Sequence, residues 1–546
     1  MLLLCGFLQS FNTLPWRSAH SESFTFLAVL MWIGAVAWRN TSVEIRLSPP
    51  IITLLCVNVL IVIQYTTGQI EFGGDFAVLW IYVQLCVSVL LIAQWHGNDA
   101  TWPNALALTL LVTALVSALI ALTQALGVWA VSDWILQYSG FRRPGANLGQ
   151  PNHLATLLLM GAASLIYLNQ RLNISRSVTV LLSLLLLLGM GITESRAGLL
   201  GGITLCLWWF ARRQVFAHGV RWQWVMASAL GLVAIIWGWP PLISRIQEAG
   251  PMQNWVTINT TTSGRMEVWQ QLWEAVWIKP WLGWGLRGVS AALNAVQHNY
   301  AQSSPFTYAH NIILDMLIGM GIPLASLALC AAGVWMWQRV KDAQTAQSWY
   351  AIGLLIPMGI HSLFEYPFAY AYFLVPTMLA IGMLEGGSKR SIAINISRKI
   401  IFGFLFLFGS LLMWLGVEYI NIEEDFRIAR FESVNLGHTP AEYEPPNIVL
   451  LTQLNALVAV TRTTPRPNMP HDELDLIRKV TLRFPWVPVQ NCYALSLALN
   501  GEPTEAIRQL QVLRATHGEK VYEGIKANWT ELAHTKYPQL NALALP

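Results

Sequence analysis

Long apolar runs separated by short polar stretches dominate the chain up to about residue 420. A helix that crosses a bilayer needs about 20 predominantly apolar residues, because it must span a hydrocarbon core of about 30 Å. The pattern predicts an all-α polytopic membrane protein with about thirteen transmembrane helices. The predicted segments are 1–13, 22–38, 48–65, 76–95, 104–126, 153–169, 177–193, 198–211, 223–239, 309–337, 349–364, 368–385 and 400–420. The first lacks a basic region and a small-residue cleavage site, so we interpret it as an anchor rather than a signal peptide.

The distribution of Lys and Arg among the loops predicts how these helices are oriented. If the N-terminus is cytoplasmic, the short cytoplasmic loops contain thirteen basic residues: Arg39, Arg46, Arg171, Arg176, Arg212, Arg213, Arg221, Arg339, Lys341, Lys389, Arg390, Arg398 and Lys399. Basic residues accumulate in cytoplasmic loops of membrane proteins. We therefore expect a cytoplasmic N-terminus. The gap around 96–103 has no basic residue and does not support this orientation.

Composition strengthens the membrane prediction. Only 11% of the residues are charged and 55% are hydrophobic, whereas soluble proteins carry about 25% charged residues. The chain therefore needs membrane lipid as a partner. Its net charge of +4 comes from dispersed residues, which does not indicate a nucleic-acid partner. The six cysteines show no metal-type spacing, and we expect no metal and no cofactor.

Two longer segments are predicted on the outer, periplasmic side. One is a loop at 240–308, and the other is the C-terminal region 421–546, which contains 12 of the 33 Lys and Arg residues. Residues 493–513 read as a helix, a Gly-Glu-Pro turn and a second helix, which resembles one tetratricopeptide-like hairpin. We expect a membrane domain over 1–420, including the loop, and a periplasmic helical domain over 421–546.

A first polar cluster, FRRPGANLGQPNHLA at 141–155, precedes the span at 153–169. Its glycines and prolines disfavour a regular helix. It provides many hydrogen-bond donors for an anionic or sugar ligand: Arg142, Arg143, Asn147, Gln150, Asn152 and His153. The alternative is an interfacial loop whose arginines reach lipid phosphates.

Two further clusters contain an arginine suited to a phosphate. In TESRAGLLGG, Arg196 offers a guanidinium fork that matches phosphate oxygens, although Glu194 could simply neutralise it as a rim pair. In the long loop, Ser263 is a plausible N-cap for a helix with a stripe of tryptophans, predicted to lie on the membrane surface or cap the bundle. Arg265 lies at its N-terminal end, where the helix dipole already favours anions.

The fourth cluster contains a candidate proton acceptor. His310, in FTYAHNIILDMLIGMGIP, lies where the long loop re-enters the membrane, and histidine titrates near neutral pH. A rim histidine that caps a helix is the alternative interpretation. His298 is a competing base deeper in the loop, and Glu365 and Tyr366 in HSLFEYP lie on the same predicted side.

These motifs resemble a known family. RRPGANLGQPNHLA and HSLFEYP are similar to the bacterial protein O-oligosaccharyltransferases of the pilin-glycosylating PglL type. SRAG, SGRMEVW…PWLGWG and AHN are shared more widely with O-antigen ligases and Wzy polymerases. The resemblance implies en bloc transfer of an oligosaccharide from undecaprenyl diphosphate to a Ser or Thr of a pilin or other periplasmic protein, without a metal.

The same resemblance assigns roles to residues. His310 corresponds to the family's loop histidine, the expected general base, and Arg196 and Arg265 to arginines that contact the diphosphate. Gln150 and Tyr366 correspond to a functional glutamine and tyrosine. The remaining substrate-binding candidates are Asn152, His153, Arg142, Arg143, Glu365 and Glu194.

Three other activities stay open from the sequence. An O-antigen ligase would transfer the glycan to lipid A-core, and a polymerase would transfer it to another lipid-linked glycan. A lipid-linked glycan transporter would place charged residues near mid-membrane and often shows internal repeats, neither of which is evident here. The Gln-Pro-Asn-His motif favours a protein acceptor.

Overall fold

The computed structural model describes residues 2–95, 101–128, 133–136, 143–216, 221–248, 264–386 and 392–546. Two compact units can be distinguished. The first comprises Met1–Cys56, Tyr82–Asn259 and Ala332–Leu411, and the second comprises Val57–Ile81, Thr260–Ala331 and Leu412–Pro546. Because the predicted domain boundary at 420 falls inside one continuous helix, α15 (Arg398–Ser433), the division into domains 1–420 and 421–546 stays a prediction.

Nine helices among the described residues are long and apolar enough to cross a membrane. They are α2 (Ala19–Arg39), α3 (Pro49–Thr66), α4 (Gly73–Trp95), α5 (Thr101–Ala125), α6 (Pro151–Leu172), α7 (Arg176–Thr193), α9 (Trp222–Glu248), α12 (Ile312–Asp342) and α15. All thirteen predicted segments contain a helix, the other four being α1 (Leu2–Leu8), α8 (Arg196–Ala211), α13 (Ala346–Ser362) and α14 (Ala371–Glu385). The membrane character is confirmed, and the number thirteen stays a prediction.

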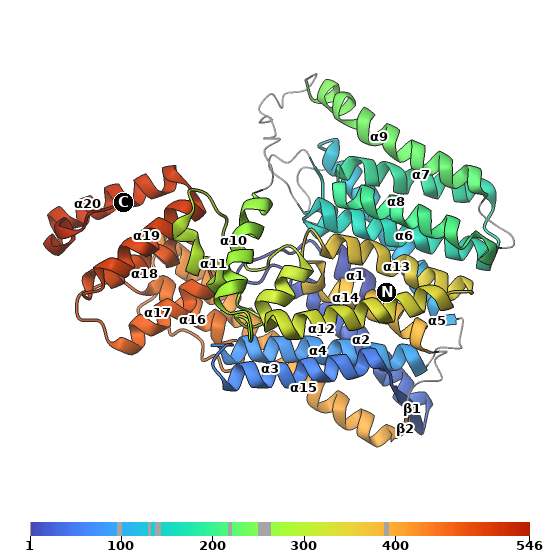
Figure 1. The fold of residues 1–546 in the computed structure, drawn as a ribbon, viewed down its shortest axis with the longest axis horizontal. Coiled ribbons are helices and arrows are strands. Elements are labelled where there is room, and N and C mark those ends of the chain that lie inside the picture. Colours follow the sequence, from blue (N-terminus) through green and yellow to red (C-terminus); the bar gives the residue numbers. More distant parts are fainter. Residues whose placement is uncertain are drawn as a thin grey trace. The chain divides into compact units, whose positions relative to one another are not determined.

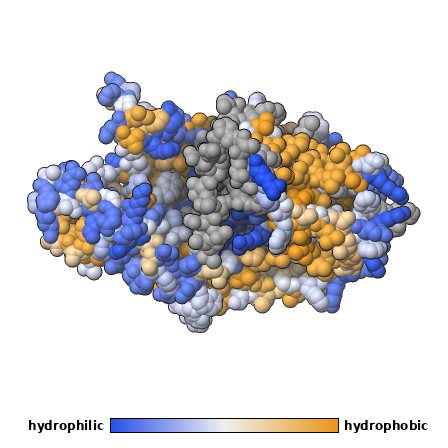
Figure 2. All heavy atoms as spheres, turned by 90° about the horizontal axis from the view of Figure 1, so that it is seen from above, coloured by the Kyte–Doolittle hydropathy of each residue, from blue (hydrophilic) through white to orange (hydrophobic). Residues whose placement is uncertain are grey.

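Helix packing in the first unit centres on α6. It packs against α5, α7, α8 and α13, and 78% of its most apolar window is buried, the highest share among the nine candidate spans of the described residues. Figure 1 shows α6, α7, α8 and α9 side by side. In Figure 2 hydrophobic residues gather over the spanning helices, whereas the C-terminal helices display mainly polar ones.

The described residues are mostly helical and include candidate membrane spans, as predicted for an all-α polytopic membrane protein. Two short strands, β1 (Ser42–Leu47) and β2 (Ile392–Ser397), pair antiparallel in a two-stranded sheet, with Val43 opposite Ile396 and Ile45 opposite Ile394. Both sequences are rich in β-branched residues, which favour a pleated strand. Each strand is too short to give a clear periodic signal in the sequence.

The second unit combines the long loop with the C-terminal region. The loop forms α10 (Arg265–Ile278) and α11 (Val289–Val296), which share a core with the start of α12. The C-terminal helices are α16 (Thr452–Arg462), α17 (His471–Arg483), α18 (Val487–Leu499), α19 (Pro503–His517) and α20 (Glu519–Thr535). Short 3-10 turns η1 (Ala146–Leu148), η2 (Arg213–Val215), η3 (Gln297–Asn299), η4 (Pro367–Ala369) and η5 (Pro538–Ala542) complete the chain.

The predicted helical hairpin at 493–513 lies in α18 and α19, which pack together across a turn at Gly501, a residue with φ +86°. Its similarity to a tetratricopeptide repeat stays a prediction. The loop and the C-terminal helices also contact each other directly. The side chain of Arg508 donates to the Asn294 carbonyl at 2.8 Å, and the Ser303 amide donates to the Ala515 carbonyl at 2.8 Å.

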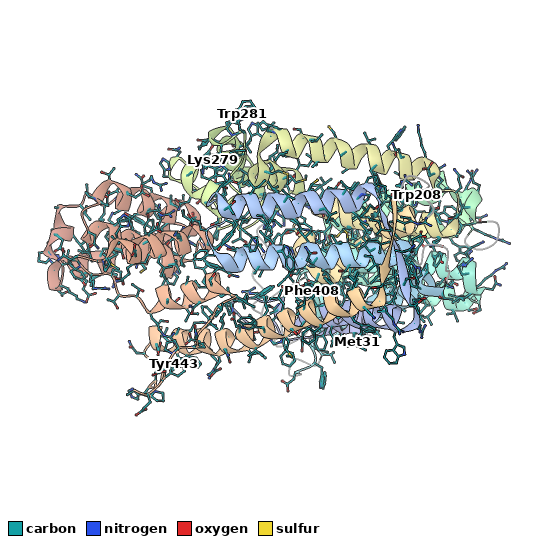
Figure 3. The ribbon with its side chains drawn as sticks, turned by 90° about the horizontal axis from the view of Figure 1, so that it is seen from below. Met31, Trp208, Lys279, Trp281, Phe408 and Tyr443 are labelled. Atoms are coloured by element: carbon teal, nitrogen blue, oxygen red, sulfur yellow. The ribbon has the colours of Figure 1, made fainter. Side chains whose placement is uncertain are left out.

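The predicted helix with the tryptophan stripe is α10, and its place on the membrane surface or over the bundle stays a prediction. Val268, Leu272 and Val276 are buried, but Trp273 and Trp277 are 50% and 59% exposed. The apolar face of α10 therefore extends beyond the buried core, and two of its tryptophans are exposed. Trp281, just after the helix, also points outward (Figure 3). Gly264 occupies the N-cap, so the prediction for Ser263 is wrong about the cap position; Ser263 itself lies outside the described residues.

Candidate functional site

Three polar motifs far apart in the sequence meet in the first unit. The Asn152 side chain donates to the Glu365 carboxylate at 3.2 Å and accepts from the Ser195 hydroxyl at 2.7 Å. Ser195 also caps α8 by accepting from the Gly198 amide at 2.9 Å. Asn152 thus connects the Gln-Pro-Asn-His motif to the start of α8, where Arg196 lies, and to the Phe-Glu-Tyr-Pro motif.

The turn before α6 is held in one conformation. A Cβ on Gly145 would lie 2.4 Å from the backbone nitrogen of Gln150, so the turn can close only on a glycine. Arg143 donates to the buried Thr193 carbonyl at 2.9 Å, which connects this turn to the end of α7. The buried Oε1 of Gln150 has no hydrogen-bond partner among the described residues, a property typical of an atom that binds a ligand or water. Arg142 lies outside the described residues.

Arg196 is exposed at the first position of α8. Within the described part of the chain it makes neither a hydrogen bond nor an ion pair, so the alternative of a rim pair with Glu194 is not formed. Glu194 itself caps α7 in a left-handed conformation, φ +48°. A guanidinium at a helix N-terminus favours an anionic ligand on two counts, its own charge and the helix dipole.

Some predicted ligands are instead packed inside the unit. His153 is 3% exposed, contacts the Tyr372 hydroxyl at 3.3 Å, and meets the Tyr370 ring edge-to-face at 4.7 Å. Tyr366 stacks on Tyr370, with ring centroids 5.9 Å apart. His361, the first residue of the HSLFEYP motif, is 1% exposed and bonds to the Thr156 hydroxyl at 2.8 Å. His153 and His361 are therefore buried, whereas Tyr366 and Tyr370 remain partly exposed.

In the second unit, His310 has a strained backbone, φ +53°. Its neighbours fix this conformation. The Ala309 amide donates to the Asp315 carboxylate at 3.0 Å, and the Ala309 carbonyl accepts from the Trp269 indole at 2.8 Å. The His310 ring stacks on Phe306 at 4.2 Å. Strain maintained in this way is typical of functional positions.

A buried ion-pair network lies beside this histidine. Asp75, 3% exposed, accepts two hydrogen bonds from Arg483 at 2.8 and 2.9 Å and pairs with Arg287 at 3.6 Å. Arg287 in turn donates to the Tyr308 hydroxyl, two residues before His310. Sequence reasoning missed this network. An aspartate near the start of an apolar segment was the only available signal.

The other candidates of the long loop lie around α10 and α11. Arg265 is the first residue of α10, whose Trp269 contacts the segment that contains His310, so both belong to one packed substructure. Lys279 lies over the Trp284 ring at 4.2 Å. Burial and the nearby Arg508 charge lower the pKa of His298, the competing base.

Comparison with known proteins assigns the same parts of the chain to glycan-transferring families. Residues 144–168 match the family described as protein glycosylation ligase, 181–329 match O-antigen ligase, and 349–531 match the C-terminal region of virulence factor membrane-bound polymerase. A general O-oligosaccharyltransferase of Acinetobacter baylyi is 25% identical over 95% of this chain and 91% of its own length. A ComP-specific O-oligosaccharyltransferase of the same organism is 27% identical over 69% of each chain.

The matched segments coincide with the polar clusters: the first contains Gln150 and Asn152, and the second contains Arg196, Arg265 and His310. The resemblance drawn from the motifs is thereby confirmed. The chain is a membrane-bound, glycosyl-transferring enzyme that is similar to the PglL-type protein glycosylation ligases and to the O-antigen ligases and Wzy polymerases.

Proposed function

We propose that this enzyme transfers an oligosaccharide en bloc from undecaprenyl diphosphate to a Ser or Thr hydroxyl of a pilin or another periplasmic protein. The observation that carries the proposal is His310, a partly exposed imidazole maintained in a strained conformation by Trp269, Asp315 and Phe306. A base fixed in this way loses little entropy when it accepts a proton from a bound acceptor.

In the proposed reaction the acceptor oxygen attacks the anomeric carbon, and the bond between that carbon and the diphosphate oxygen breaks. The diphosphate leaves with the bonding electrons, and the hydroxyl proton passes to His310. One displacement inverts the anomeric centre without a covalent enzyme intermediate. Arg196 and Arg265 stabilise the negative charge that develops on the leaving group. Because two guanidinium groups supply the positive charge that balances the leaving group, we expect transfer to continue when EDTA removes metal ions.

The remaining candidates are proposed to orient the donor. Gln150 offers an unsatisfied buried oxygen to a sugar hydroxyl. Asn152 and Glu365 hold the start of α8, and with it Arg196, in place. Tyr366, Arg142, Arg143, Glu194 and His153 complete the proposed donor site. The membrane domain is proposed to lie in the bacterial inner membrane, with a cytoplasmic N-terminus and the active site and residues 421–546 in the periplasm.

Reconstitution tests the proposal. The purified chain is incubated with undecaprenyl-diphosphate glycan and a candidate pilin, and glycopeptides are identified by mass spectrometry. A His310→Ala variant should lose about 10²–10⁴-fold in rate, the usual contribution of a general base. His438→Ala, at an exposed histidine of the C-terminal region, is the matched control, and His298→Ala tests the competing base.

The acceptor is tested in parallel. Transfer to lipid A-core instead of pilin would indicate an O-antigen ligase, and chain extension of the donor would indicate a polymerase. Movement of the donor across vesicles without any transfer would indicate a transporter. Full activity of His310→Ala would remove the proposed base. Arg196→Ala and Arg265→Ala should each weaken transfer, whereas Arg213→Ala, at an exposed arginine of η2, should not.

A further inference from the structure

A cavity of about 750 Å³ lies among α6, α7, α8 and α9, all within the first unit. Leucine, isoleucine and valine side chains make up most of its wall. Leu184, Ile203 and Val233 are at least 46% exposed, so apolar wall residues also face the surroundings of the helices. A second cavity of about 490 Å³ shares Arg176 and Trp224 with it. Cavities of this size accept small amphiphilic ligands.

One end of the cavity is positively charged. Arg176 is the first residue of α7, Arg221 directly precedes α9, and both line the wall. Both side chains are exposed, and neither forms a hydrogen bond or ion pair with another side chain in the described ranges. An apolar channel with two uncompensated guanidinium groups at one end matches a ligand with a long apolar chain and an anionic head.

A buried donor in the wall also indicates a ligand with oxygen atoms. Trp209, near the end of α8, is 3% exposed, and its indole N–H has no acceptor among the described residues. The neighbouring Trp208 satisfies its own N–H by donating to the Trp349 carbonyl at 3.1 Å. Buried donors are almost always paired, so an acceptor oxygen from a bound molecule would resolve this exception.

The charged end of this cavity lies at the opposite end of α7 from Arg196, although its apolar wall extends to Met190 and Leu199. From Arg221 to Ile235 the wall is about 21 Å long at 1.5 Å per residue, which is long enough for an acyl chain that spans the ~15 Å of hydrocarbon in one leaflet. Arg176 is the first residue of the 18-residue α7, which is about 27 Å long, and Arg196 lies just beyond its other end. A diphosphate at Arg196 therefore leaves Arg176 and Arg221 without a counter-ion.

We propose that this cavity binds an anionic phospholipid of the leaflet opposite Arg196, the cytoplasmic leaflet in the proposed orientation. The lipid phosphate pairs with Arg176 and Arg221, a lipid oxygen accepts from Trp209, and an acyl chain lies between α7, α8 and α9. The bound lipid fills the space between α9 and the rest of the bundle. The proposal does not depend on glycan transfer.

Native mass spectrometry of the full-length protein tests this. The protein in detergent is titrated with phosphatidylglycerol and phosphatidylcholine of identical acyl chains. Phosphatidylglycerol should bind at least tenfold more tightly. Arg176→Gln with Arg221→Gln should remove that preference, whereas Arg213→Gln with Arg398→Gln, two exposed arginines outside the wall, should retain it. Ser183→Trp, which places a large side chain in the cavity, should weaken the binding of both lipids.

Equal binding of the two lipids by the unmodified protein would overturn the proposal. So would an unchanged preference in the Arg176 and Arg221 double variant, which alters only exposed side chains and is checked for folding by gel filtration. Tighter binding of undecaprenyl phosphate than of phosphatidylglycerol would also overturn it, by assigning the cavity to a polyprenyl chain. Because each readout is lipid binding, loss of transferase activity cannot be mistaken for any of these outcomes.

Discussion

The buried Asp75 network gives the sharpest stability prediction. Asp75 accepts a bidentate pair from Arg483 and faces Arg287, so Asp75→Asn leaves two guanidinium groups without their carboxylate. Removing one partner of a buried ion pair costs about 3–5 kcal/mol. Both arginine side chains remain 18% exposed and can gain water, which places the cost near the lower end, about 3 kcal/mol.

The network connects the start of α4 to the loop and to α17, so its loss should appear as local opening. A cost of ~3 kcal/mol corresponds to about 150-fold greater exposure to exchange. Hydrogen exchange followed by mass spectrometry should show this loss of protection in peptides covering 284–310 and 474–486. Transfer should also fall, because Arg287 positions Tyr308 beside the His310 segment.

Asp472→Asn is the matched control, because this exposed aspartate on α17 has no ion pair among the described residues. Unchanged protection in Asp75→Asn would refute the reasoning. Combining Asp75→Asn with Arg483→Gln should cost less than the sum of the two single changes, since the second removes a charge that the first has left unpaired.

Three further predictions concern single positions. Gly145→Ala should destabilise the turn by about 1–3 kcal/mol because its Cβ would overlap a backbone nitrogen, while Gly416→Ala, with open space around it, should not; thermal unfolding measures both. Ser195→Ala should cost about 1 kcal/mol through loss of the α8 cap and should reduce transfer more than it reduces stability. Burial lowers the pKa of His517 from 6.5, so the unfolded state binds its proton first, and stability should fall as pH drops below about 6.5. His517→Gln should flatten that dependence in hydrogen exchange of α18 and α19, and His438→Gln should not.

Hydropathy predicted the spans well because lipid imposes a length and an apolar composition that any single segment reveals. The motifs predicted which residues to examine, because polar groups at a membrane rim are costly without a role. Neither hydropathy nor the motifs indicate which residues contact one another in the fold. Arg483 lies 408 residues after Asp75, and Asn152 meets Glu365 across 213 residues. Only the packing of the intervening helices determines these pairs. The sequence therefore indicated which residues belong to the site, but not which of them contact each other.

Backbone conformation adds an independent reason to trust the motifs. Among the described residues, six other than glycine have positive φ, and three of them are asparagines, which tolerate the left-handed region. The other three are Ala146, Glu194 and His310, and each lies within a different polar cluster. Each such residue costs of order 1–3 kcal/mol. A fold selected for stability alone would place glycine or asparagine there. Three separate turns have this unfavourable conformation at the motif positions. This indicates that the site requires a particular backbone geometry as well as particular side chains.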